Sequence, residues 1–390
     1  MTTVTVEPSN RLKKLPPYLF AEIDRLKREA KANGADIIDF GVGDPDLPTP
    51  NFIIEELYKG AQDPANHRYA LDAGMPELRE EIAAWFLRRF GVKLDPNEEI
   101  LPLIGSKEGI AHLPLAVLNP GDVTLVPDPC YPVYKSATYF AGGETSDVAL
   151  LPENNFLPDY STIDPEALKQ ARLMYLNYPN NPTAACAPIE FYEETVRFAK
   201  EHDIIVAQDA AYTEMAYDGY KPVSFLQAEG AKEVGVEFHS LSKTYNMTGW
   251  RVGFVAGNPE VLKVLGKVKA NCDSGIFQAV QLAAVKALRD GDQAIQDNIK
   301  IYEERRNLLC DGLEKLGWKV TKPQATFYIF ASVPAGYSST ELCSKLLKDA
   351  GIVVTPGTGF GDNGEGFIRF AITVPKERII EALERIKNLK

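Results

Sequence analysis

Residues 239–253, HSLSKTYNMTGWRVG, contain a lysine at the point where a buried β-strand is expected to end. Lys243 lies between Ser242 and Thr244, and Arg251 follows eight residues later. A lysine amine whose pKa is lowered by burial or nearby cations can act as a nucleophile or a base. Hydroxyl and guanidinium groups are donors suited to a phosphate. The stretch therefore predicts covalent chemistry at Lys243 beside an anion site, and a solvated lysine in a polar loop is the alternative.

Other polar side chains follow other predicted strands. Ser106 and Lys107 begin a helix after LPLIG, Asn181 follows MYLNYP, and Asp209 ends IIVAQD with Tyr212 three residues later. Ligands of open parallel sheets bind beyond the carboxyl ends of the strands. A helix N-terminus with free N–H groups is in addition a phosphate site. We therefore expect one crevice to collect all these side chains.

Pyridoxal 5′-phosphate (PLP) accounts for this set of residues. Lys243 would form a Schiff base with the aldehyde, and a buried Asp209 would keep the pyridine nitrogen protonated so that the ring withdraws electrons. The cofactor also needs hydrogen-bond donors to its phenolate oxygen, for which we expect Tyr212 and Asn181. A flat ring should stack against the pyridine, and Tyr131 is expected there. The donors expected at the phosphate are Ser106, Lys107, Ser240 and Arg251.

Nucleotide cofactors fit the sequence less well. A dinucleotide site needs G-x-G-x-x-G after the first strand of its fold. The nearest glycine cluster, PGTGFGDNG, has Asp362 where the third glycine should be, and it lies late in the chain. The P-loop pattern G-x-x-x-x-G-K-[ST] does not occur.

Composition excludes several classes of protein. The net charge of −12 disfavours a nucleic-acid or anionic-membrane partner, since either would need a basic surface. The five cysteines form no C-x-x-C pair and the four histidines form no H-E-x-x-H motif, so we expect neither a disulfide framework nor a metal site. No apolar run approaches the roughly 20 residues of a membrane span. We expect a cytoplasmic protein.

The pattern of elements predicts an α/β protein. From about residue 100, short apolar strands alternate with amphipathic helices, which indicates a mainly parallel sheet covered on both faces. After about residue 276 a long helical region leads into an α+β unit, in which Ser338 and Glu341 would form a capping box. We expect three parts: residues 1–45 packing with the second unit, 46–285 as a large cofactor-binding domain, and 286–390 as a small α+β domain.

Along nearly its whole length the chain resembles the fold-type I PLP-dependent aminotransferases, which include classes I and II. The specific landmarks are YPNNPT, Asp209 with Tyr212, and SLSKTYNMTGWRVG. The resemblance implies a large domain with a mainly parallel seven-stranded sheet and a smaller α+β domain. Within the group the chain is most similar to the LL-diaminopimelate aminotransferases, in RLKKLPPYLFAEID, DFGVGDPDLPTP, LIGSKEGIAH and FHSLSKTYNMTGWRVG.

The resemblance also implies roles for individual residues. Lys243 is the expected catalytic residue, both as the Schiff-base lysine and as the proton shuttle. Arg369, in GFIRFAIT, would clamp the substrate α-carboxylate, and Gly43 would contact the same group through its backbone. Lys107 and Asn181 would contact substrate as well as cofactor.

Three further residues are implied by the resemblance at the interface between two copies of the chain. Tyr69, in HRYALDAG, would reach the cofactor phosphate of a partner subunit, which implies a homodimer with shared active sites. Asp72 and Tyr18 would meet the distal end of the substrate. Diaminopimelate enzymes often carry Glu where this chain has Asp72, which keeps the charge but is one methylene shorter.

The resemblance implies an exchange of amino groups between LL-diaminopimelate and 2-oxoglutarate, giving tetrahydrodipicolinate and glutamate in lysine biosynthesis. Amino acids and 2-oxoacids would be the small-molecule partners. An aspartate- or alanine-type aminotransferase is the nearest alternative. A β-lyase on the same fold and a non-enzymatic PLP-binding regulator are the others.

Overall fold

The computed structural model describes residues 4, 6–15, 25, 27–29, 32 and 34–389. Its largest sheet, here called the large sheet, has seven strands in the order β2-β8-β7-β6-β5-β3-β4. Only β8 runs against its neighbours, so the predicted mainly parallel seven-stranded sheet is confirmed. The strands are β2 (Ile100–Leu103), β3 (Val123–Asp128), β4 (Glu144–Ala149), β5 (Ala171–Asn177), β6 (Ile205–Asp209), β7 (Gly235–Ser240) and β8 (Gly253–Gly257).

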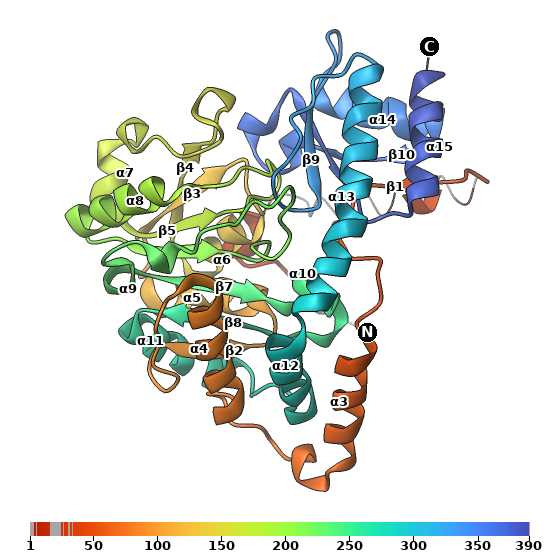
Figure 1. Ribbon diagram of the computed structural model, residues 1–390. Helices are drawn as coiled ribbons and strands as arrows, with labels where there is room; N and C mark the ends of the chain where they lie inside the picture. The colour runs from red at the N-terminus through yellow and green to blue at the C-terminus, as the bar shows by residue number, and fades with distance from the viewer. Residues whose placement is uncertain are drawn as a thin grey trace.

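Helices cover both faces of the large sheet (Figure 1), which is why its central strands β3 and β7 are buried along their whole length. Alternate residues of β5 show the two faces: Met174 and Leu176 belong to one core cluster, and Leu173 and Tyr175 to another. The first cluster includes side chains of α3 (Asn51–Gln62), α4 (Pro76–Phe90), α8 (Ile189–His202) and α12 (Gln278–Asp290). The second includes side chains of α5 (Ser106–Val117), α6 (Val133–Ala141) and α11 (Pro259–Cys272).

A second unit lies beyond one end of the large sheet, at the upper right of Figure 1. Its three-stranded antiparallel sheet, here called the small sheet, has the order β11-β12-β9. These strands are β9 (Tyr328–Ser332), β11 (Thr355–Pro356) and β12 (Phe367–Ala371). Side chains of β9 and β12 share a separate core cluster with those of α13 (Asp292–Lys315), α14 (Ser339–Ala350) and α15 (Lys376–Lys387). The predicted capping box between Ser338 and Glu341 is present at the start of α14.

The N-terminal residues contact both units. In β1 (Ile38–Asp39) the chain pairs with β10 (Ile352–Val353), next to the small sheet. By contrast, Arg11 of α1 (Asn10–Lys13) donates to the carbonyl oxygen of Phe140, and Lys14 pairs with Glu144 on β4, beside the large sheet. The division at residues 45 and 285 stays a prediction. None of the described helices is long and apolar enough to cross a membrane.

The remaining short helices of the large-sheet unit are α7 (Pro165–Gln170), α9 (Ala231–Val234) and α10 (Leu241–Thr244). Of these, α10 matters most for function, because it begins directly after β7 and contains Lys243.

Candidate active site

A pocket of about 440 Å³ lies at the carboxyl ends of the parallel strands. The predicted residues that line it are Gly43, Ser106, Lys107, Tyr131, Asn181, Asp209, Tyr212, Ser240, Lys243, Arg251 and Arg369. They come from the large sheet, the small sheet and the segment after β1, so the pocket lies between the two sheets. A larger hollow of about 850 Å³, bordered by residues 152–157 and 318–324, contains none of the predicted side chains.

Lys243 presents to this pocket an amine with a lowered pKa. The side chain of Ser240 caps α10 by accepting from the backbone N–H of Ser242, which fixes the turn that carries the lysine. Lys243 Nζ donates to the carbonyl oxygen of Gly43 at 3.1 Å. Burial lowers the pKa of Lys243 to about 8, with Arg251 and Arg369 adding to the effect and Asp44 opposing it. An amine with such a pKa can accept and return a proton near neutral pH.

Asp209 presents a carboxylate oxygen that lacks a donor. Its Oδ2 accepts a hydrogen bond from the hydroxyl of Tyr134 at 2.9 Å. Its Oδ1 is buried and has no hydrogen-bond partner among the described residues. Burial raises the pKa of Asp209 to about 6, and the bond from Tyr134 opposes that rise. A buried acceptor left open at a pocket wall is suited to a ligand N–H.

Arg369 is a fixed cation on the small-sheet side of the pocket. It lies on β12 and is 1% exposed. Its Nη1 donates to Asn181 Oδ1 and its Nη2 to the carbonyl oxygen of Gly41, each at 2.7 Å. The rings of Tyr328 and Phe360 contact the guanidinium, with centroids at 4.2 and 4.6 Å. Although burial lowers the pKa of Arg369, a guanidinium stays charged, so its planar donor fork is held ready for a carboxylate.

The N-terminus of α5 and Arg251 form a cationic corner of the pocket. Gly105, immediately before the helix, has a φ of +76°, and a Cβ there would overlap the guanidinium of Arg251. A Cβ on Gly253 would come within 2.8 Å of the backbone nitrogen of Ser106. Burial and the nearby Arg251 lower the pKa of Lys107. Because glycine leaves the helix N–H groups open beside two cations, this corner suits a phosphate.

The residues missing from the sequence prediction include Asn177 and Tyr328, which line the pocket, and Tyr134, which contacts Asp209. Asn177 ends β5, where its Oδ1 accepts from the backbone N–H of Asn181 at 2.8 Å. The hydroxyl of Tyr328 lies 3.0 Å from that of Tyr212. Tyr134 lies one helical turn after Tyr131, which is a local signal that could have been used. Tyr328 carries no such signal, because only the pairing of β9 with β12 brings it to Arg369.

Tyr69 and Asp72, which are expected to act across a subunit interface, lie outside the pocket of their own chain. Tyr69 is 93% exposed and Asp72 is partly exposed. Tyr18 lies outside the described residues.

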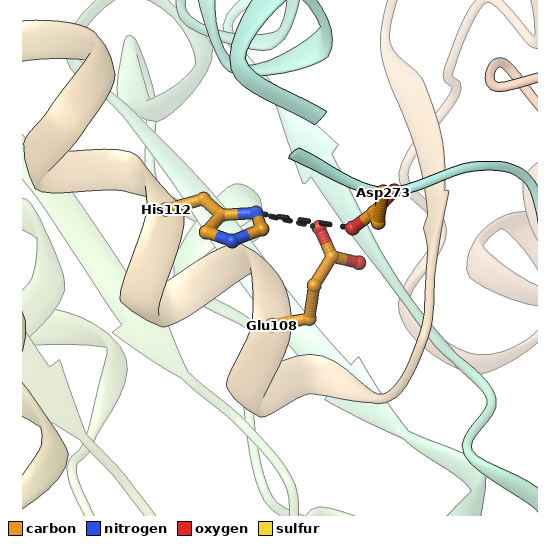
Figure 2. A group of neighbouring side chains, drawn as sticks. All are labelled: Glu108, His112 and Asp273. Atoms are coloured by element: carbon orange, nitrogen blue, oxygen red, sulfur yellow. Dashed lines mark hydrogen bonds and ion pairs between the residues drawn. The ribbon is translucent and has the colours of Figure 1, made fainter. Parts of the chain in front are cut away.

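A second cluster of ionisable groups includes two side chains of α5 (Figure 2). Glu108 and His112 project from α5 toward Asp273, which follows α11, and one ligand atom of each lies within 4.8 Å of the others. No other group of three such residues with metal-ligand spacing occurs among the described residues. The fully buried ammonium of Lys269 contacts Glu108 at 3.3 Å and Asp273 at 2.8 Å. These carboxylates therefore already have a cation, and the cluster holds α5 against α11.

The groups that line the pocket fit PLP. The Lys243 amine, with its lowered pKa, suits the aldehyde, and the unpartnered carboxylate oxygen of Asp209 suits the pyridine N–H. The cationic corner suits the phosphate. A side chain at residue 105 or 253 would collide with Arg251 or with the start of α5, so these glycines keep the cationic corner intact.

Known proteins agree with this assignment. The family model "Aminotransferase class I and II" matches residues 35–386. The LL-diaminopimelate aminotransferases of Syntrophobacter fumaroxidans and Halothermothrix orenii are 56% and 53% identical to the chain, over 98% of each chain. The apo structure of BacF from Bacillus subtilis superposes with a TM-score of 0.95 at 41% identity, covering 99% of this chain and 98% of that one. The chain therefore belongs to the class I and II aminotransferases, and PLP is its cofactor.

Proposed function

We propose that this aminotransferase exchanges amino groups between LL-diaminopimelate and 2-oxoglutarate, giving tetrahydrodipicolinate and glutamate in lysine biosynthesis. The substrate assignment is supported by the name that the most similar relatives carry. The observation that carries the chemistry is the convergence of Lys243, Asp209 and Arg369 on one pocket.

Lys243 is the proposed catalytic residue. Bound PLP supplies the electron sink that makes the substrate Cα–H acidic. Lys243 Nζ, with a pKa of about 8, takes the Cα proton and returns it. Asp209, whose buried Oδ1 lacks a partner among the described residues, would accept a hydrogen bond from the cofactor's ring N–H, and its negative charge would keep that proton in place.

The other predicted residues bind and orient. Arg369 pairs with the substrate α-carboxylate through its two Nη groups, assisted by the backbone at Gly43 and by Asn181, which holds the guanidinium. Tyr212 and Asn181 would donate hydrogen bonds to the phenolate oxygen of the cofactor. The other proposed cofactor contacts are Ser106, Lys107, Ser240 and Arg251 at the phosphate and Tyr131 against the ring, with Lys107 and Asn181 also facing the substrate.

We further propose a homodimer with composite active sites. Tyr69 and Leu71 are 93% and 70% exposed, which is unusual for side chains of this size and suits a surface that a second copy covers. Tyr69 would then complete the phosphate site of that copy, and Asp72 and Tyr18 would read the distal end of its substrate. With a net charge of −12 the protein would bind no nucleic acid, and it would act in the cytoplasm.

A substrate screen tests the proposal. Single-turnover rates of the PLP form should be compared for LL-diaminopimelate, meso-diaminopimelate, aspartate, alanine and glutamate. We expect LL-diaminopimelate and glutamate to react fastest. A clear preference for aspartate or alanine would assign the chain to that type of aminotransferase. Release of pyruvate and ammonia without an oxoacid would indicate a β-lyase.

A further inference from the structure

A segment of the small-sheet unit is anchored to the end of a large-sheet strand. This segment, residues 357–364, connects β11 to β12 and includes the short turns Gly357–Gly359 and Asp362–Gly364. Asp128, the last residue of β3, is 2% exposed, and its Oδ1 accepts from the backbone N–H of Asn363 at 3.0 Å. Its Oδ2 lies 3.3 Å from Lys135 Nζ. A buried carboxylate is thus used to hold a backbone N–H that lies 235 residues away in the sequence.

Two further contacts fix the same segment. Gly361 has a φ of +144°, and a Cβ there would overlap the carboxylate of Asp128, so the segment approaches as closely as a glycine permits. The backbone N–H of Cys130 donates to the carbonyl oxygen of Phe360 at 2.8 Å. The chain at the end of β3 therefore holds the segment at residue 360 and again at residue 363.

These contacts lead directly to the pocket. The ring of Phe360 lies 4.6 Å from the guanidinium of Arg369. On the other side of the contact, Cys130 is followed by Tyr131, which lines the pocket. The anchored segment thus joins the cation on the small sheet to the ring beside the large sheet.

We propose that Asp128 is a positioning residue that sets the placement of Arg369 relative to Lys243 and the cofactor site, and thereby the affinity for the substrate carboxylate. The inference rests on the proposed role of Arg369. Arg369 belongs to the small sheet, whereas Lys243 and Asp209 belong to the large sheet, so their separation depends on contacts between the two units. A binding group must be held within roughly 0.5 Å of its productive position. A charge-assisted hydrogen bond from a backbone N–H to a buried carboxylate is a strong constraint of this kind.

The test compares substrate affinity with cofactor affinity in Asp128→Ala. In single-turnover reactions of the PLP-loaded enzyme, the apparent Kd for glutamate should rise at least about tenfold, because a displaced Arg369 would lose one of its charge-assisted hydrogen bonds to the substrate carboxylate. The Kd of the apoenzyme for PLP, measured by fluorescence titration, should stay near the wild-type value. Asp128→Ala removes none of the proposed cofactor ligands, and it leaves the hydrogen bond from Cys130 to Phe360 beside Tyr131 in place. Asp147→Ala is the matched control: it removes the other, more exposed partner of Lys135, 2.8 Å away, and should change neither constant.

Two other variants test the contact separately. Asp128→Asn keeps an oxygen for the N–H of Asn363 and should recover much of the lost glutamate affinity. Gly361→Ala disturbs the contact from the opposite side and should weaken glutamate binding as Asp128→Ala does. If Asp128→Ala fails to fold, as judged by circular dichroism, these two variants decide the question.

Arg369→Lys separates this inference from the function it rests on. If Arg369→Lys leaves the Kd for glutamate unchanged, the carboxylate role of Arg369 is wrong. If Arg369→Lys weakens glutamate binding and the variants of Asp128 and Gly361 do not, Asp128 does not position it. An equal loss of PLP affinity in Asp128→Ala would also overturn the inference, because it would indicate general damage to the pocket.

Discussion

Replacing Tyr134 with phenylalanine should change the pH range in which the apoenzyme binds PLP. The Tyr134 hydroxyl donates to Asp209 Oδ2 at 2.9 Å and so stabilises the ionised carboxylate. Tyr134 is fully buried, and its ring stacks on that of Tyr175 with centroids 4.7 Å apart. Phenylalanine would keep this packing and remove only the hydroxyl. The buried carboxylate would then lose a donor, and its pKa must rise.

The size of the rise follows from the strength of the hydrogen bond. A hydrogen bond to a charged group contributes about 1.5–3 kcal/mol, and one pKa unit corresponds to about 1.4 kcal/mol. The pKa of Asp209, about 6 in the native protein, should therefore rise by roughly one to two units. At pH 7 the native carboxyl is about one-tenth protonated, whereas that of the variant would be about half or more protonated. A protonated Asp209 cannot offer a negative charge to the pyridine N–H.

The assay is the Kd of the apoenzyme for PLP between pH 5.5 and 8.5. Binding by the native protein should weaken as the pH falls through about 6. In Tyr134→Phe the same weakening should begin roughly one to two units higher, and the two proteins should converge at pH 8.5. Asp209→Asn should bind weakly throughout, without this titration. Equal weakening of Tyr134→Phe at every pH, or an unchanged midpoint, would refute the reasoning.

Three further predictions concern the pocket and its interface. Lys243→Ala should abolish transamination while the cationic corner still binds PLP; in the native enzyme, borohydride should attach the cofactor to Lys243, and peptide mapping to another lysine would contradict this role. Arg369→Ala should cost about 2–5 kcal/mol in kcat/KM for every amino acid, since it removes a buried charge partner. Arg369→Lys should recover only part of that loss, because the planar fork is missing; full activity would argue against a bidentate pair. Asp72→Asn should slow the diaminopimelate half-reaction much more than the glutamate half-reaction, because only diaminopimelate has a distal ammonium. Equal slowing of both in single-turnover measurements would remove Asp72 from substrate recognition.

The sequence alone determined the large sheet and the convergence of most pocket residues. Apolar strands separated by amphipathic helices require a sheet covered on both faces, which the seven-stranded sheet is. The parallel strands bring their carboxyl ends to one edge. Asn181, Asp209 and Lys243 follow β5, β6 and β7, so their meeting was predictable from local sequence.

Only the tertiary structure decided how these groups are held. Tyr134 bonds to Asp209 across 75 residues, and Tyr328 to Tyr212 across 116. Arg369 reaches Asn181 across 188 residues. Periodicity records which face of an element is apolar, but it carries no information about which distant element will pack against that face. These partners are therefore set by how the two sheets pack against each other.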